Sequence, residues 1–551
     1  MVKGKVMSFL TKLNSLRSSS QQRFAMLPKT TVPRSQFDVS ASHMFDFYPD
    51  YLIPIYWHDV LPGETLSLSH EILGMLTNAM VAPIMNNLYL EVQYWFVPYR
   101  LIWDNWERFQ GARKNPDDSI DFLIPQMNSG ENGVDFLSMH DYIGVPPGVA
   151  NLDFNCMVHR AYNKIYNVWY RDQNLQDSVP EHTGDGPDPI EDYVLLKRGK
   201  RKDYFTSCLP WPQKSPDGSA VTLGLGTTAP VIGNGNPLGL TEGMGLSTES
   251  YQMVANPSNG SLGSFSNPGY DGVTGVSEDP EKSGLVADLS EATSITINRL
   301  RLAIQMQRLF ERDARGGTLY SDILASHFGV ISPDARLQRP EYLGGGFQRF
   351  QIQGIPQTSA TDDVTPQGTL TAIGGVLDTS GKFMKSFVEH GVVLGLASVR
   401  TDITYQQGLP RQLSYQTRYD LYMPVFAHLG EQAVLNKEIY AQGKDVVDEN
   451  GDPVDDQVFG YQERWAEYRY GFNRISGTLR STHPQSLDKW HLAQKFDQLP
   501  TLSSEFIEST MPWQRMMSVT DEPPFRLYCR WNGVADLPMP ASSIPGLMDH
   551  F

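Results

Sequence analysis

The stretch that most constrains this chain runs from residue 86 to residue 111 and reads NNLYLEVQYWFVPYRLIWDNWERFQG. Its first half alternates with a period of two, which is typical of a β-strand with one buried face. The residues predicted to share that face are Leu88, Leu90, Val92, Tyr94 and Phe96. Pro98 ends the predicted strand because proline has no N–H to donate to a neighbouring strand.

The period changes after Pro98. Ile102, Trp106 and Phe109 are spaced by four and three residues, which places them on one stripe of a short helix that Gly111 can end. We expect Trp95, Ile102, Trp106 and Phe109 to belong to the structural core. An ordinary core strand with its connection explains the same pattern.

The other strands of the first hundred residues follow one another without a helix between them. Residues 51–60 are a largely apolar strand, 61–64 (LPGE) form a turn, and 65–73 alternate. This order predicts an antiparallel β meander and argues against a parallel α/β sheet. The 47 glycines and 37 prolines also favour turns over helical bundles.

Composition excludes several classes of protein. The chain is 40% hydrophobic and 11% aromatic, which suits a large core and not a disordered chain. No apolar run is long enough for a membrane span, so no membrane insertion is expected. Three cysteines far apart give no disulfide framework, which fits a reducing cytosol.

Charge is unevenly distributed along the chain. Residues 1–37 contain seven basic residues and no acidic ones, whereas the rest contains 38 basic and 62 acidic residues. The seven are Lys3, Lys5, Lys12, Arg17, Arg23, Lys29 and Arg34. A basic arm on an acidic body predicts a segment that contacts nucleic acid phosphates, and a merely solvated terminus is the alternative.

Residues 218–285 differ from the rest of the chain in composition. This window contains 14 of the 47 glycines, with six acidic residues and one basic residue. A segment of this length without a periodic apolar pattern is a functional loop or a disordered segment. We expect it to leave the core and stand on the outer surface, with Tyr251, Phe265 and Tyr270 at contacts with neighbouring loops or a receptor.

Several blocks of the chain resemble the major capsid protein of the gokushoviruses, small icosahedral single-stranded DNA phages of the Microviridae. They include WDNWERFQG at 103–111, DYFTSCLPWPQK at 203–214, and ERDARGGT at 311–318 followed by SPDARLQRPEYLGGG at 332–346. The blocks keep their order over most of residues 37–551.

The resemblance implies a mainly β fold, an eight-stranded antiparallel jelly-roll barrel of the viral coat type with long loop insertions and a few short helices. It implies about sixty copies in a T=1 icosahedral shell around a circular single-stranded DNA genome. It also implies assembly in the bacterial cytoplasm, a small basic DNA-binding phage protein as a partner, a host-cell receptor, and a protrusion at the three-fold axes formed by 218–285. The resulting division is a basic arm (1–37), a first part of the barrel (38–217), the insertion (218–285) and the remainder (286–551).

No catalytic, metal or cofactor site is predicted. The chain contains no HExxH, GxSxG, GKS/T or CxxC motif. Cys156 and His159 have the spacing of half a metal site, but a buried thiol beside a helical histidine explains them without a metal. The alternative function is a carbohydrate-binding β-sandwich or a glycoside hydrolase, since aromatic strands and acidic loops also suit sugars.

Overall fold

The computed structural model describes residues 33–214, 297–330, 338–358, 361 and 367–542, and six short strands between 231 and 287. The chain divides into two compact units. One comprises residues 1–210, 332–427 and 433–551, and the other comprises 211–331 and 428–432. Within the described residues, no helix combines the length and the apolar character needed to cross a membrane.

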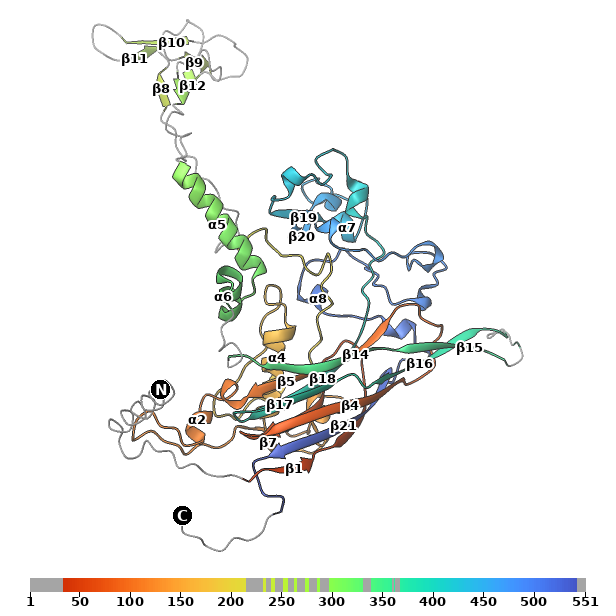
Figure 1. The fold of residues 1–551 in the computed structure, drawn as a ribbon. Helices are drawn as coiled ribbons and strands as arrows, with labels where there is room; N and C mark the ends of the chain where they lie inside the picture. Colours follow the sequence, from red (N-terminus) through yellow and green to blue (C-terminus); the bar gives the residue numbers. More distant parts are fainter. Residues whose placement is uncertain are drawn as a thin grey trace, which may run out of the picture. The chain divides into compact units, whose positions relative to one another are not determined.

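Two antiparallel sheets form the centre of the first unit (Figure 1). The larger sheet has seven strands: β1 (Ser35–Asp38), β2 (Ala41–Phe47), β4 (Thr65–Leu76), β15 (Gln351–Pro356), β16 (Leu370–Asp378), β17 (Lys382–Ser386) and β21 (Phe525–Leu537). The smaller sheet has four strands in the order β14 (Glu341–Arg349), β5 (Leu88–Pro98), β18 (Gly391–Thr401) and β3 (Ile53–Val60). The mainly β antiparallel fold is therefore confirmed, whereas the expected count of eight barrel strands is not, because the two sheets contain seven and four.

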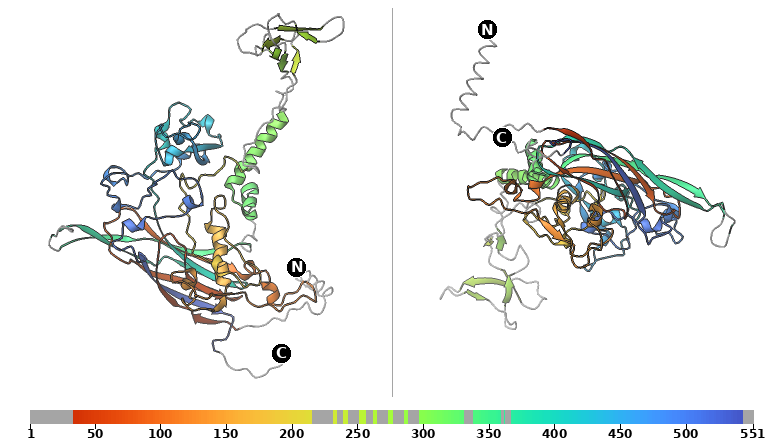
Figure 2. Two further views of the ribbon diagram at one scale, coloured as in Figure 1. Left: turned by 180° about the vertical axis from the view of Figure 1, so that it is seen from behind. Right: turned by 90° about the horizontal axis from the view of Figure 1, so that it is seen from below.

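The predicted meander is wrong. β3, β4 and β5 follow one another in the chain but do not pair with one another: β3 and β5 both pair with β18, and β4 pairs with β21, β16 and β17. Alternation in a sequence shows which face of a strand is buried, but it does not show which strand lies beside it. Most partners lie hundreds of residues away, and the two sheets run as neighbouring layers in both further views (Figure 2).

The core lies between the two sheets and is built from alternate residues of their strands. The side chains at 88, 90, 92, 94 and 96 of β5 all belong to it, as the alternation predicts. The opposite face of β5 is also buried: Trp95 and Val97 pack into a second apolar cluster with Tyr162 and Ile165 of α4 (Met157–Ile165). The expectation of a single buried face on β5 is therefore wrong, because an insertion layer covers the far side of the smaller sheet and Trp95 lies in the core there.

The helix predicted after Pro98 is broken. A 3₁₀ turn, η2 (Tyr99–Leu101), precedes the single turn α2 (Trp106–Phe109), and Gly111 follows with φ +95°. Ile102 is buried, but Trp106 and Phe109 are only partly buried. The break brings Trp103 inward: it is completely buried and its Nε1–H donates to Asp185 Oδ1 at 2.7 Å.

The remaining elements are short or lie in insertions. The first unit also contains β6 (Gln126–Asn128) paired with β7 (Asp153–Asn155), α3 (Met139–Ile143), the π-helical turn η3 (Tyr166–Tyr170), α7 (Asn436–Ile439), β20 (Val458–Glu463) and α8 (Ser504–Ile507). β20 pairs with β19 (Glu431–Leu435). The second unit contains α5 (Ile297–Arg315), α6 (Tyr320–Phe328), β8 (Val231–Gly233), β9 (Gly239–Glu242), β10 (Tyr251–Ala255), β11 (Leu262–Ser264), β12 (Val273–Val276) and β13 (Leu285–Ala287).

Residues 218–285 contain more regular structure than their sequence suggests. Strands β11, β10, β9 and β12 form a four-stranded antiparallel sheet, and β13 pairs with β8. Short glycine-rich strands give little periodic signal, because glycine has no side chain to alternate between faces. The expectation of a segment without secondary structure is therefore corrected.

Candidate interaction surfaces

The residues proposed for nucleic acid contact lie almost entirely outside the described part of the chain. Of the seven cations of the arm, only Arg34 is described, and its Nη2 donates to Thr65 Oγ1 at 3.1 Å and to the Asp536 carbonyl at 3.3 Å. It is therefore held at the edge of the seven-stranded sheet, where β1 pairs with β21. Tyr251 begins β10, and Phe265 and Tyr270 lie outside the described residues.

A basic run at residues 197–202, KRGKRK, for which the sequence analysis predicts no role, forms ion pairs within the protein. Arg198 and Arg201 both contact the carboxylate of Glu91 on β5, at 2.6 and 2.5 Å, and Arg400 of β18 joins them at 2.6 Å. Burial raises the pKa of Glu91, but the three guanidinium groups outweigh this effect and lower it overall. Glu91, which alternation assigns to a solvated face, is only 7% exposed.

The lysines of the run are also occupied. Lys202 pairs with Asp172, and Lys197 lies 3.8 Å from Glu508. Lys200 is buried with its Nζ 4.2 Å from the centre of the Phe506 ring, and burial lowers the pKa of Lys200 to about 8. The run therefore ties the insertion layer to the sheet and offers little free charge to a ligand.

An apolar row crosses the outer face of the seven-stranded sheet. Met44 of β2 is in register with Tyr528 of β21, Tyr528 with Leu73 of β4, and Leu73 with Leu377 of β16. These side chains are 74%, 40%, 46% and 60% exposed, respectively. Neighbouring apolar residues on four adjacent strands are typical of a surface that binds another protein. The signal in the sequence is that the outward positions at the end of β4 are apolar where alternation predicts polar residues.

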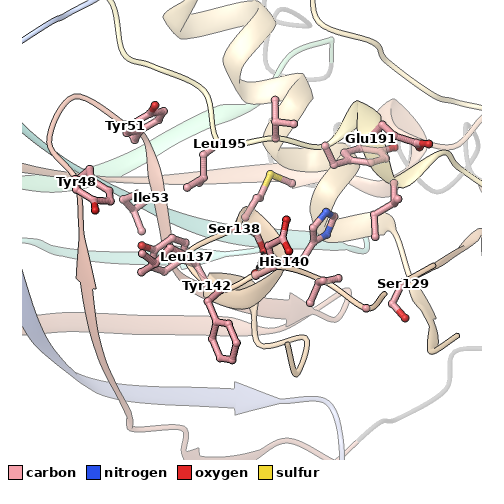
Figure 3. A pocket seen from close by; sticks show the side chains of 18 residues that line it. Tyr48, Tyr51, Ile53, Ser129, Leu137, Ser138, His140, Tyr142, Glu191 and Leu195 are labelled. Atoms are coloured by element: carbon pink, nitrogen blue, oxygen red, sulfur yellow. Dashed lines mark hydrogen bonds between the residues drawn. The ribbon is translucent and has the colours of Figure 1, made fainter. Parts of the chain in front are cut away.

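A cavity of about 550 Å³ opens beside α3 (Figure 3). Tyr48, Tyr51 and Ile53 lie on one side of it, and Ser129, His140 and Glu191 on the other. Two of its polar groups are already engaged: Ser129 Oγ donates to the Val149 carbonyl at 2.7 Å, and His140 Nδ1 lies 3.0 Å from His159 Nε2. The arrangement can enclose a ligand, but neither Ser129 nor His140 is poised as a nucleophile or a base.

The thiol and the histidine that could form half a metal site do not face a common ion. Cys156 Sγ donates to the Pro125 carbonyl at 3.2 Å, and His159 pairs with His140. Burial lowers the pKa of His159 to about 3, so this imidazole is neutral at physiological pH, and burial lowers the pKa of His140 as well. Across the described residues, no group of three or more potential ligand side chains could hold a metal ion.

Comparison with known proteins identifies the family to which this chain belongs. The sequence model of the family described as "Capsid protein (F protein)" matches residues 25–547. The chain belongs to this capsid protein family. The capsid protein VP1 of Bdellovibrio phage phiMH2K is 45% identical over 516 residues, covering 91% of this chain and 92% of that protein. The capsid protein VP1 of Chlamydia phage 1 is 41% identical and covers 98% of this chain and 100% of its own.

A third relative, the capsid protein VP1 of Spiroplasma virus 4, is 36% identical and covers 95% of this chain and 97% of its own length. These matches confirm the resemblance to gokushovirus coat proteins and the prediction of a major capsid protein. The chain is therefore a structural component of a virion that assembles with copies of itself into a shell. The alternative of a carbohydrate-binding protein or glycoside hydrolase is not supported.

Proposed function

We propose that about sixty copies of this capsid protein form a closed T=1 shell around a circular single-stranded DNA genome. The observation that supports this most is the exposed row of Met44, Tyr528, Leu73 and Leu377, which lies in register across four strands. A soluble monomer rarely leaves such a surface uncovered, so a neighbouring copy is its natural occupant. Burying it contributes roughly 25 cal/mol for each Å² of apolar surface removed from water.

Assembly of the full-length protein tests this proposal. We expect the parent protein to sediment as megadalton particles with nuclease-protected single-stranded DNA, and Leu73→Asp to remain as subunits. Ser67→Asp, on the same face of β4 but outside the row, is the matched control and should assemble. Particles from Leu73→Asp equal to those of the parent would remove the row from the interface, and a parent of about 62 kDa would contradict the shell itself.

The basic arm, residues 1–37, is proposed to contact the genome on the inner face. Its seven cations without an anion can neutralise phosphates, and Arg34 fixes the end of the arm to the sheet edge. A small basic phage protein is proposed to share this task, in particles assembled in the bacterial cytoplasm. Replacing the seven cations by Gln should lower the DNA content while shells still form. Unchanged DNA content would assign the charge-neutralising role to the partner alone.

The insertion, residues 218–285, is proposed to form the protrusion at the three-fold axes and to contact a host receptor through Tyr251, Phe265 and Tyr270. Its own small sheets support an independent module, and its six acidic residues disfavour a position against DNA. Deleting residues 222–282 and joining the ends with a Gly/Ser linker should leave shells that assemble but attach poorly. Normal attachment would remove the receptor role, and failure to assemble would make the insertion part of the scaffold.

A further inference from the structure

A second cavity, of about 330 Å³, lies in the first unit beneath the loop at residues 471–480. Four aromatic rings line it, those of Tyr204, Phe205, Tyr405 and Phe472. Phe205 and Phe472 pack edge-on against Tyr204, with ring centres 5.1 Å apart in each pair. The wall is therefore rigid and apolar, and its size suits a single flat ring system with a substituent.

The acidic residues of this cavity are engaged by the protein itself. Asp203 Oδ1 accepts hydrogen bonds from the backbone N–H groups of Phe205 and Thr206 at 2.9 and 2.8 Å. Glu438 accepts from Arg411 at 2.9 Å and from the Tyr204 hydroxyl at 2.8 Å. Both carboxylates hold the cavity together: the charge of Glu438 is balanced by Arg411, and Asp203 is held by backbone N–H groups.

The basic residues at the rim are not balanced in this way. Arg474 and Arg480 are exposed lining residues, and within the described part of the chain neither forms a salt bridge with a carboxylate. Arg480 Nη1 donates to the Gln406 carbonyl at 3.1 Å, which aligns that guanidinium along the rim. Two uncompensated cations therefore lie beside an aromatic wall, in a body whose acidic residues outnumber its basic ones.

The backbone of the same loop offers further donors. In residues 471–476, no backbone N–H donates to another group of the described chain, and Asn473 Nδ2 ties the loop down by donating to the Ile403 carbonyl at 2.8 Å. Peptide N–H groups without a partner in the protein must bind solvent or a ligand oxygen. Together with Arg474 and Arg480 they suit a phosphate.

We propose that this cavity binds a nucleotide unit of single-stranded DNA, with the base against Phe472 and the neighbouring phosphates on Arg474 and Arg480. Aromatic stacking and guanidinium–phosphate contacts are the two terms by which proteins hold single strands without reading their sequence. This inference rests on the proposed function, which supplies single-stranded DNA as the partner. The same chemistry fits a free nucleotide, so the test includes both.

The test is a fluorescence titration of the full-length protein with an eight-residue thymidine oligonucleotide and, separately, with thymidine monophosphate. We expect Arg474→Gln with Arg480→Gln to weaken oligonucleotide binding at least tenfold and to reduce the slope of log K against log salt concentration by about 1.4, since each phosphate contact contributes about 0.7 on a single strand. Phe472→Leu should weaken binding roughly tenfold without changing the slope. Arg113→Gln is the matched control and should bind like the parent, because Arg113 is exposed and its side chain bonds only to the Pro116 carbonyl within the described residues.

Two results decide between the sources of the ligand. Binding of the oligonucleotide at least a hundredfold tighter than the monophosphate supports a strand, and equal affinities support a free nucleotide in the same cavity. Unchanged binding of both ligands by the double variant, with a melting temperature like that of the parent, would overturn the inference. If the parent protein forms particles with protected DNA but the double variant binds the oligonucleotide as tightly as the parent, the shell proposal stands. Only the assignment of this cavity as a nucleotide site would then be wrong.

Discussion

Two basic regions of this capsid protein have opposite fates. Residues 197–202 carry five cations in six positions, whereas 471–480 carry two in ten. The cations of the denser run pair with Glu91 and Asp172 or are buried against Phe506. Arg474 and Arg480 instead lie at the rim of an aromatic cavity, without a carboxylate partner among the described residues. An anionic ligand is attracted by cations that have no carboxylate partner in the folded protein. The number of cations in a stretch of sequence does not show how many of them remain without such a partner.

The largest expected effect concerns the carboxylate that neutralises the denser run. Glu91→Gln leaves the buried Arg198 and Arg400 close together without their anion, while Arg201 keeps only Asp402 at 3.6 Å. Breaking a buried ion pair in this way costs about 3–5 kcal/mol. We expect a corresponding drop in the free energy of unfolding, measured by denaturant titration of the full-length protein. Glu71→Gln, exposed on β4, should change it by less than about 0.5 kcal/mol. If Glu91→Gln were as stable as the parent, solvent and not Glu91 would be compensating the positive charge of residues 197–202.

An intermediate effect concerns Lys200, whose pKa of about 8 lies below its ordinary value of 10.5. Between these values the unfolded chain binds more protons than the folded one, so the stability of the parent should rise with pH across this window. Lys200→Met should be more stable than the parent by about 1–3 kcal/mol at pH 7, and the difference should shrink toward pH 10.5. Thermal unfolding at a series of pH values measures it. Lys202→Met, whose parent side chain is 56% exposed, should give no gain.

The smallest effect on stability is expected in the sparser region. Arg474→Gln with Arg480→Gln should change the free energy of unfolding by less than about 0.5 kcal/mol, because both side chains are exposed and neither forms a salt bridge in the described chain. Calorimetry of the full-length protein checks this. A loss of several kcal/mol would mean that the cations of both regions stabilise the fold, and the contrast between the two regions would then be wrong.

The sequence predicted single elements better than their arrangement. The alternation in β5 identified its core face, and Pro98 and Gly111 mark the ends of their elements as expected. The burial of Glu91 could not be predicted, because the arginines that enclose it come from residues 198, 201 and 400, far from β5 in the sequence. Strand pairing failed for the same reason: the partners of β4 and β5 are supplied by β21 and β18, which lie more than 290 residues later.

The candidate contacts show a similar limit. The spacing of Ile102, Trp106 and Phe109 suggested one helix, but the indole of Trp103 reaches Asp185 only if the helix breaks. The apolar row could be suspected from Leu73 and Met75 at outward positions, yet its continuity needs the register of four strands. The cavity at 471–480 draws its walls from segments near residues 204, 405 and 438, which no spacing rule brings together.

The most direct test of the whole account is an electron cryomicroscopy map of DNA-filled particles made from this chain. We predict a T=1 shell in which nucleotide density lies against Phe472, Arg474 and Arg480, with none against residues 197–202. A map with ordered nucleotides at 197–202, or with the 471–480 cavity on the outer surface of the shell, would contradict the account.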